Sequence, residues 1–140
     1  MTNRKYKKYL PYFAWTIALV ALIGSLILSE VLKFPPCVLC WYQRIAVYPQ
    51  VVLIGIGILM NTTDYIKYSL PLLYLGALIG IYHNLLYYGI LPESAEFCSS
   101  GISCTTRYIE ILGFITIPLL SLSAIILLIT CLLIIKKARK

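Results

Sequence analysis

The chain has 140 residues, of which 61% are hydrophobic and only 12% are charged, and its mean hydropathy is +0.89. A soluble domain of this length could not cover so much apolar surface, so the composition excludes soluble classes and indicates an integral membrane protein. The net charge of +7 does not indicate a nucleic-acid-binding protein, because the basic residues crowd at the two ends of the chain. Basic clusters beside apolar runs are typical of the cytoplasmic ends of membrane spans.

The apolar segments predict an all-α, four-helix membrane bundle that forms a single domain over the whole chain. Each segment has about the 20 residues or more that a helix needs to cross a bilayer. The predicted spans are 10–28, 40–60, 69–91 and 111–135. A turn is expected at 61–67, where Asn-Thr-Thr-Asp interrupts the apolar pattern.

The distribution of Lys and Arg orients this bundle. Nine of them fall at the two termini and at Lys67, whereas three fall on the other side. The positive-inside rule therefore predicts that both termini are cytoplasmic. The loop 29–36 and the polar stretch 92–110 are then extracytoplasmic, and each of them brings a pair of cysteines to that side.

The first pair, Cys37 and Cys40, follows Pro35-Pro36 and is called here the helix-entrance pair. Pro-Pro cannot lie inside a helix but can lead into one, which predicts a helix that starts near Cys37. Both thiols would lie in its first turn, where the helix dipole stabilises a thiolate. Arg44 would lie one turn beyond Cys40 on the same face. A guanidinium below the membrane surface is a candidate functional group, although an arginine that reaches out to the headgroups is an open alternative.

The third span contains His83 in its outer half, eight residues before the predicted end at Leu91. A histidine at this depth has two open interpretations, a helix–helix hydrogen bond or a place beside a cofactor. Gly76 and Gly80 in the same span have the spacing of a close helix contact. Cys131, in the last span, is too far from either pair to join a disulfide, and we expect it to be an ordinary small apolar residue.

The second pair, Cys98 and Cys104, is called here the loop pair. Two dithiols on the oxidising side of a membrane predict thiol–disulfide exchange between them. The loop pair encloses Gly101 and three serines, so it could close a small ring and reach an aqueous partner. The helix-entrance pair is closer to lipid, where a membrane-soluble electron carrier could meet it.

The string Cys-Val-Leu-Cys-Trp-Tyr-Gln-Arg at 37–44, followed by Tyr48-Pro49, resembles the first-loop motif of the bacterial disulfide-bond formation protein B family, DsbB. The loop 98–104 and the segment 113–118 resemble its shorter branch, BdbC, of Gram-positive bacteria. The resemblance covers essentially the whole chain. It implies a multi-pass protein of the bacterial plasma membrane that passes electrons to a membrane quinone, menaquinone or ubiquinone. Its partner would be an extracytoplasmic thioredoxin-fold thiol oxidase similar to DsbA or BdbD, which introduces disulfides into secreted proteins.

The resemblance also implies a role for each site residue. Cys98 would form the mixed disulfide with the partner, and Cys104 would resolve it. Electrons would pass to the helix-entrance pair, with Cys40 as the thiolate next to the quinone, Arg44 polarising a quinone oxygen and His83 near the quinone. The loop departs from that of the best-known members, which separate their cysteines widely, so a disulfide rearrangement between the loops is not implied here.

Three other functions stay open at this stage. A vitamin K epoxide reductase-like protein is also a four-helix thiol oxidase, but its two cysteine pairs come in the reverse order. A structural zinc held by four outer cysteines is opposed by the loose spacing of the loop pair and by the oxidising compartment, and we expect no metal. A non-catalytic subunit with two structural disulfides would have no need of Arg44.

Overall fold

The structure is a computed structural model that describes residues 2–92 and 116–139. These residues contain helices and no strand, which confirms the all-α prediction. The helices are α1 (Thr2–Leu26), the π-helix η1 (Ile27–Val31), α2 (Val38–Leu59), α3 (Tyr65–Tyr87) and α4 (Ile117–Arg139). Among the described residues, four segments are long and apolar enough to cross a membrane, and they correspond to the four predicted spans.

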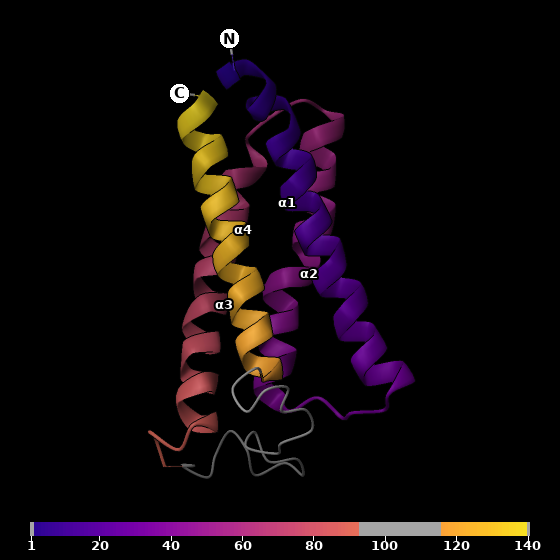
Figure 1. Ribbon diagram of the computed structural model, residues 1–140, viewed down its shortest axis with the longest axis vertical. Helices are drawn as coiled ribbons and strands as arrows, with labels where there is room; N and C mark the ends of the chain where they lie inside the picture. The colour runs from indigo at the N-terminus through magenta and orange to yellow at the C-terminus, as the bar shows by residue number, and fades with distance from the viewer. Residues whose placement is uncertain (1, 93–115, 140) are drawn as a thin grey trace.

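The four long helices form an up-and-down bundle (Figure 1). The two termini lie at one end of the bundle, and the first residues of α2 lie at the opposite end (Figure 1). Each helix packs against two neighbours in the cyclic order α1, α2, α3, α4, whereas α2 and α4 make only a minor contact across the bundle. A chain that crosses a membrane an even number of times must have both termini on the same side, and this arrangement meets that requirement.

The helix ends differ from the predicted span boundaries by a few residues. The third helix ends at Tyr87 and not at Leu91, because Gly89 has a φ of +71° that ends the helix. The amide of Gly89 donates to the carbonyl of Leu86, and that of Ile90 donates to Leu85, which is the Schellman pattern. Asn61, with a φ of +51°, ends α2 in the same way, as its place in a predicted turn suggests.

The first helix is longer than its predicted span, since α1 begins at Thr2 and continues as η1 to Val31. The segment from Ser29 onward was expected to be a loop, and the structure shows that the loop begins only after Val31. The fourth helix begins at Ile117; the predicted start at residue 111 lies outside the described residues.

Small residues allow α2 and α3 to approach closely. A Cβ added to Gly76 would lie 2.6 Å from the Cβ of Ala46 in α2, and one added to Gly80 would lie 3.0 Å from Leu122 in α4. The predicted small-residue contact is therefore confirmed, and it faces both neighbours of α3. Asn84 adds a polar link, because its Nδ2 donates to the carbonyl of Pro118 over 3.2 Å. These contacts determine how α2, α3 and α4 meet near the cysteines.

Candidate functional site

The helix-entrance pair lies at the start of α2, as predicted. Cys37 is the N-cap residue, with an extended backbone (φ −71°, ψ 169°) that continues the Pro-Pro segment. The amide of Trp41 donates to the carbonyl of Cys37 over 3.2 Å and closes the first turn, which contains Cys40. Both cysteines are free thiols, and Cys37 is the more buried of the two. Their Sγ atoms are 3.1 Å apart, so the two sulfurs can exchange a proton or join with little movement.

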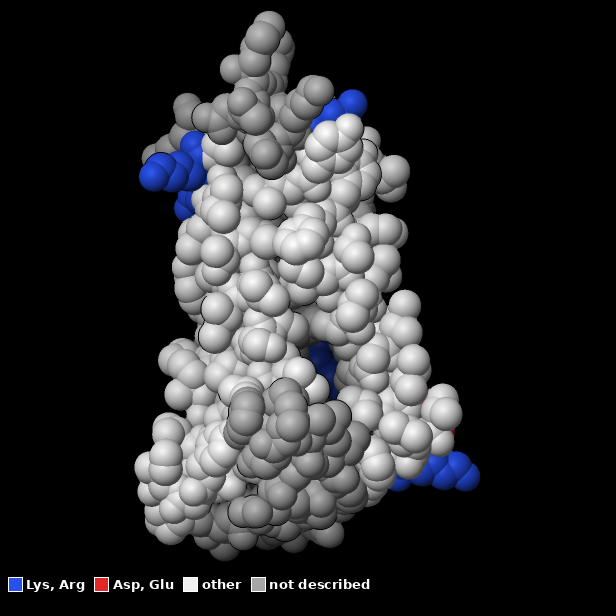
Figure 2. All heavy atoms as spheres, viewed as in Figure 1, with Lys and Arg blue, Asp and Glu red and all other residues white. Residues whose placement is uncertain are grey.

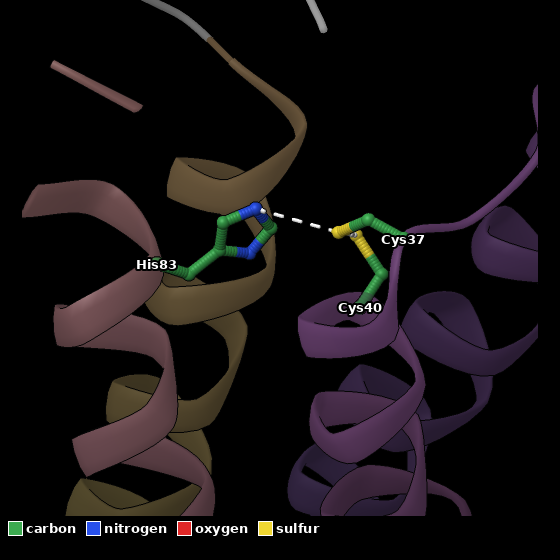
Figure 3. Close-up of side chains that lie close together, drawn as sticks. All are labelled: Cys37, Cys40 and His83. Atoms are coloured by element: carbon green, nitrogen blue, oxygen red, sulfur yellow. Dashed lines mark hydrogen bonds between the residues drawn. The ribbon is translucent and has the colours of Figure 1, made fainter. Parts of the chain in front are cut away.

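His83 reaches the pair from α3 (Figure 3). Its Nε2 lies 3.7 Å from the Sγ of Cys37, and its Nδ1 lies 3.0 Å from the amide nitrogen of Gln43 in α2. The imidazole is only 1% exposed. When Gln43 presents its N–H to Nδ1, Nδ1 accepts and Nε2 carries the proton that points at Cys37.

The structure corrects the expected depth of His83 in the third span. It also bears on the two interpretations of this residue, a helix–helix hydrogen bond and a place beside a cofactor. It lies four residues before the end of α3 at Tyr87 and not eight residues inside the span, because Gly89 ends the helix early. The helix–helix hydrogen bond is present, through Gln43. A role toward a cofactor stays a prediction, but His83 lies close enough to a cysteine to act on it.

The environment of Cys37 favours a thiolate. Hydrogen bonding from Cys40 lowers the pKa of the Cys37 thiol to about 4, and His83 contributes in the same direction against the opposing effect of burial. Cys37 therefore carries negative charge at neutral pH in the reduced pair. The resemblance assigns the thiolate next to the quinone to Cys40, and that assignment stays a prediction.

Arg44 is half-buried between α1 and α2. One guanidinium nitrogen donates to the carbonyl of Ser25 over 3.2 Å, next to the point where α1 becomes η1. Its Cζ lies 5.5 Å from the ring centroid of Trp41, which is within cation–π range. The hydrogen bond and the ring contact hold the cation inside the bundle, one turn from Cys40.

Two cavities meet at Arg44. The smaller one, of about 90 Å³, is lined by Cys37, Cys40, His83 and Arg44 among others. The larger one, of about 480 Å³, lies between α1, α2 and α4 and shares Arg44 with the first. Figure 2 shows a hollow in one face of the molecule with basic atoms visible inside it.

The larger cavity is mainly apolar, and it reaches the outer surface of the bundle. It is lined by Val20 of α1 and Leu127 of α4, which are 64% and 51% exposed. Its polar groups include Arg44 and Tyr48, and the Tyr48 hydroxyl lies 3.4 Å from that of Ser25. The helix-entrance pair therefore lines a cavity that shares Arg44 with a second cavity, and this second cavity opens to the side of the protein that would face lipid.

The other three cysteines of the chain are not part of this site as the structure describes it. Cys98 and Cys104, the loop pair, lie outside the described residues. Cys131 is buried in the main apolar core at 6% exposure, which agrees with its expected structural role.

Sequence reasoning did not assign a role to Gln43, which the structure brings against His83. Gln43 is 2% exposed although it is an amide in an apolar helix. Its signal was available, because it follows Cys40 by three positions and so lies on the same face of the helix. The sequence alone does not show that a neighbouring helix supplies its hydrogen-bond partner, His83.

The described residues also bring three potential metal ligands together. The donor atoms of Cys37, Cys40 and His83 all lie within 4.8 Å of one another. This set differs from the four-cysteine set considered from the sequence, because a histidine takes the place of the loop pair.

The comparisons with known proteins identify the family of this chain. The family model described as "Disulfide bond formation protein DsbB" matches residues 7–135. Disulfide bond formation protein C of Bacillus subtilis is 47% identical over 123 residues, covering 84% of this chain and 86% of that protein. Probable disulfide formation protein C 1 of Bacillus anthracis is 39% identical over 131 residues, 94% of each chain.

A similar protein occurs outside Bacillus. The probable disulfide formation protein of Coxiella burnetii is 42% identical over 127 residues, which cover 89% of this chain and 85% of that protein. No solved structure matches the chain. The family match, the four candidate spans and the adjacent cysteines lead to one conclusion: this chain belongs to the DsbB family of membrane disulfide bond formation proteins.

Proposed function

We propose that this protein is a quinone-dependent thiol oxidase of the bacterial plasma membrane that reoxidises an extracytoplasmic thioredoxin-fold partner. The observation that carries the proposal is the junction of the two cavities at Arg44. It brings a cavity lined by two adjacent cysteines next to an apolar cavity that opens to the lipid-facing side. Two structural disulfides in a non-catalytic subunit would have no use for such a cavity.

The larger cavity suits a membrane quinone, which has a ring with two carbonyl oxygens and a long apolar tail. A volume of about 480 Å³ falls within the range of about 300–1,000 Å³ that is typical of ligand sites. Arg44 and Tyr48 would hold the ring oxygens, while the exposed apolar residues of α1 and α4 would accept the tail. When bound, the quinone would supply an acceptor for the two electrons and two protons that leave the dithiol of the helix-entrance pair as it closes to a disulfide.

The side chains around the pair have distinct tasks in this function. His83 presents its Nε2–H to Cys37 and so stabilises the thiolate by a hydrogen bond. Gln43 keeps the imidazole ring in place through Nδ1. Arg44 places a fixed positive charge one turn from Cys40, and its bond to the Ser25 carbonyl limits its movement.

The resemblance supplies the first half of the electron path. A thiolate of the reduced partner attacks Cys98 of the loop disulfide, and Cys104 leaves as a thiolate. The partner's second thiol then releases the mixed disulfide; Cys104 cannot take the resolving role that the resemblance suggested, because its attack on Cys98 would only re-form the loop disulfide. The loop dithiol then reduces the helix-entrance disulfide, so two electrons move at each step. The positive-inside rule puts both pairs on the extracytoplasmic side, where the partner would be.

The test is quinone reduction by the purified full chain in detergent, with a reduced thioredoxin-fold partner. Menaquinone and ubiquinone analogues are both supplied, and Cys40→Ser and Cys98→Ser are compared with wild type. Cys131→Ser is the matched control, because it also removes one thiol but lies in the apolar core. We expect turnover in wild type and the control and none in the other two variants. Absence of turnover in wild type across both quinones and several partners would favour structural disulfides.

A further inference from the structure

We propose that the reduced form of the helix-entrance pair, together with His83, is a binding site for Zn²⁺. Two sulfurs and one imidazole nitrogen are a ligand set that zinc favours. The three donor atoms come from two helices and already lie within 4.8 Å of one another. The loop pair has no part in this site.

The distances are close to those of a tetrahedral zinc site. Zn–S and Zn–N bonds of about 2.3 and 2.0–2.1 Å put S and N ligands roughly 3.6 Å apart and two S ligands roughly 3.8 Å apart. The Cys37 Sγ to His83 Nε2 distance is 3.7 Å, and the Sγ–Sγ distance is 3.1 Å. The two sulfurs have to separate by roughly 0.7 Å to reach that spacing, and Cys40 is only partly buried.

Gln43 completes the site from outside the ligand set. Zinc-bound histidines usually donate their second ring N–H to an oxygen, which orients the ring and raises its basicity as a ligand. The side-chain amide of Gln43 lies 3.0 Å from Nδ1 of His83. If this amide is flipped, its oxygen accepts the proton of Nδ1–H. The lone pair of Nε2 is then free to bind the metal. The same amide can therefore serve either a thiolate or a bound cation.

The fourth zinc position would face the smaller cavity, whose volume of about 90 Å³ has room for a water. Binding displaces the proton that remains on the reduced pair and involves no change in oxidation state. It needs both thiolates, so zinc and the disulfide exclude each other. On the proposed function, bound zinc would hold the pair reduced and stop electron transfer, which makes the site regulatory.

The experiment measures Zn²⁺ binding directly. The full chain carrying Cys98→Ser, Cys104→Ser and Cys131→Ser is reduced, freed of reductant without oxygen, and titrated with Zn²⁺ against a chromophoric chelator. We expect one Zn²⁺ per chain when the pair is reduced and none after it is oxidised. Cys40→Ser in this background should abolish binding.

Two further variants test the contribution of His83 and of the amide that orients it. Gln43→Leu should weaken binding about 10–100-fold, the usual effect of losing a group that supports a ligand, and His83→Ala should weaken it more. Helix content by circular dichroism shows whether each variant is folded, and Cys40→Ser provides a test that does not depend on His83. Binding unchanged in a folded His83→Ala protein, or no binding to the reduced parent, would overturn the site.

This result can be separated from that of the proposed function. Quinone turnover of wild type is measured in the presence of a chelator, where no zinc can act. Turnover without zinc binding would leave the oxidase intact and end this inference. Zinc binding without quinone turnover would support the zinc site but would contradict its proposed role in regulating electron transfer. Both together predict that added Zn²⁺ inhibits turnover and that the chelator restores it.

Discussion

The contact between Gly76 of α3 and Ala46 of α2 offers a direct test of how the bundle holds the site. A Cβ at Gly76 would lie 2.6 Å from the Cβ of Ala46, whereas two carbon atoms prefer about 3.5–4.0 Å. Gly76→Ala should therefore push α2 and α3 apart by about 1 Å or strain them. These are the helices that carry Gln43 and His83, whose nitrogens are now 3.0 Å apart.

The magnitude follows from two opposing effects. Overpacking of this kind costs about 1–3 kcal/mol, while alanine in place of glycine in a helix gains roughly 0.5–1 kcal/mol. Gly24→Ala isolates the second effect, because a Cβ at Gly24 has nothing within 4 Å. We expect Gly76→Ala to be less stable than Gly24→Ala by about 1–3 kcal/mol, the overpacking contribution alone.

The assay is unfolding of the detergent-solubilised protein by SDS, followed by circular dichroism. Ala46→Gly combined with Gly76→Ala should recover most of the loss, and the double-mutant cycle gives the interaction free energy of the pair. Equal stability of Gly76→Ala and Gly24→Ala would refute the close approach of α2 and α3. Lack of recovery by Ala46→Gly would refute the assigned contact.

Three further outcomes follow from the contacts at the cysteine end. Gln43→Leu leaves the Nδ1 of buried His83 without its partner, so we expect a loss of about 1–3 kcal/mol in the same unfolding assay; an unchanged stability would contradict the pairing. Asn84→Leu removes the bond to the Pro118 carbonyl and should cost about 1 kcal/mol, whereas a gain in stability would argue against this link between α3 and α4. The pKa of Cys37 is lowered to about 4, and only the thiolate reacts with iodoacetamide, so in the presence of a chelator its alkylation rate should stay near its maximum down to about pH 5. An ordinary thiol would lose reactivity below about pH 8.5, and that profile, read by mass spectrometry, would contradict the proposed environment.

Composition and local pattern were enough to determine the architecture of this protein. Four apolar runs of spanning length permit little else, because backbone groups in lipid must be satisfied within helices. The start of α2 at the helix-entrance pair was equally predictable, since Pro35-Pro36 excludes a helix before it and permits one after it. The end of α3 was missed although Gly89 was visible in the sequence, because the apolar run continues past the glycine to Leu91.

The family was also within reach of the sequence, because the eight residues 37–44 form a specific string, and the family match over 7–135 confirms it. The roles of Cys98 and Cys104 rest on that resemblance, since the loop pair lies outside the described residues. The proposed partner rests on it in the same way, whereas the proposed quinone has added support from the cavities beside Arg44.

Tertiary structure alone decided which side chains surround the cysteines. His83 and Gln43 are 40 positions apart, and helical periodicity within one segment carries no information about which face of another helix it meets. That choice came from packing: the small residue Gly76 lets α3 approach α2, and the Asn84–Pro118 bond joins α3 to α4. Together they turn His83 toward Cys37 and Gln43. The sequence by itself determined the helices and the reactive pair, and the packing of the helices determined the histidine, the amide and the cavities around it, because those depend on contacts between segments far apart in the chain.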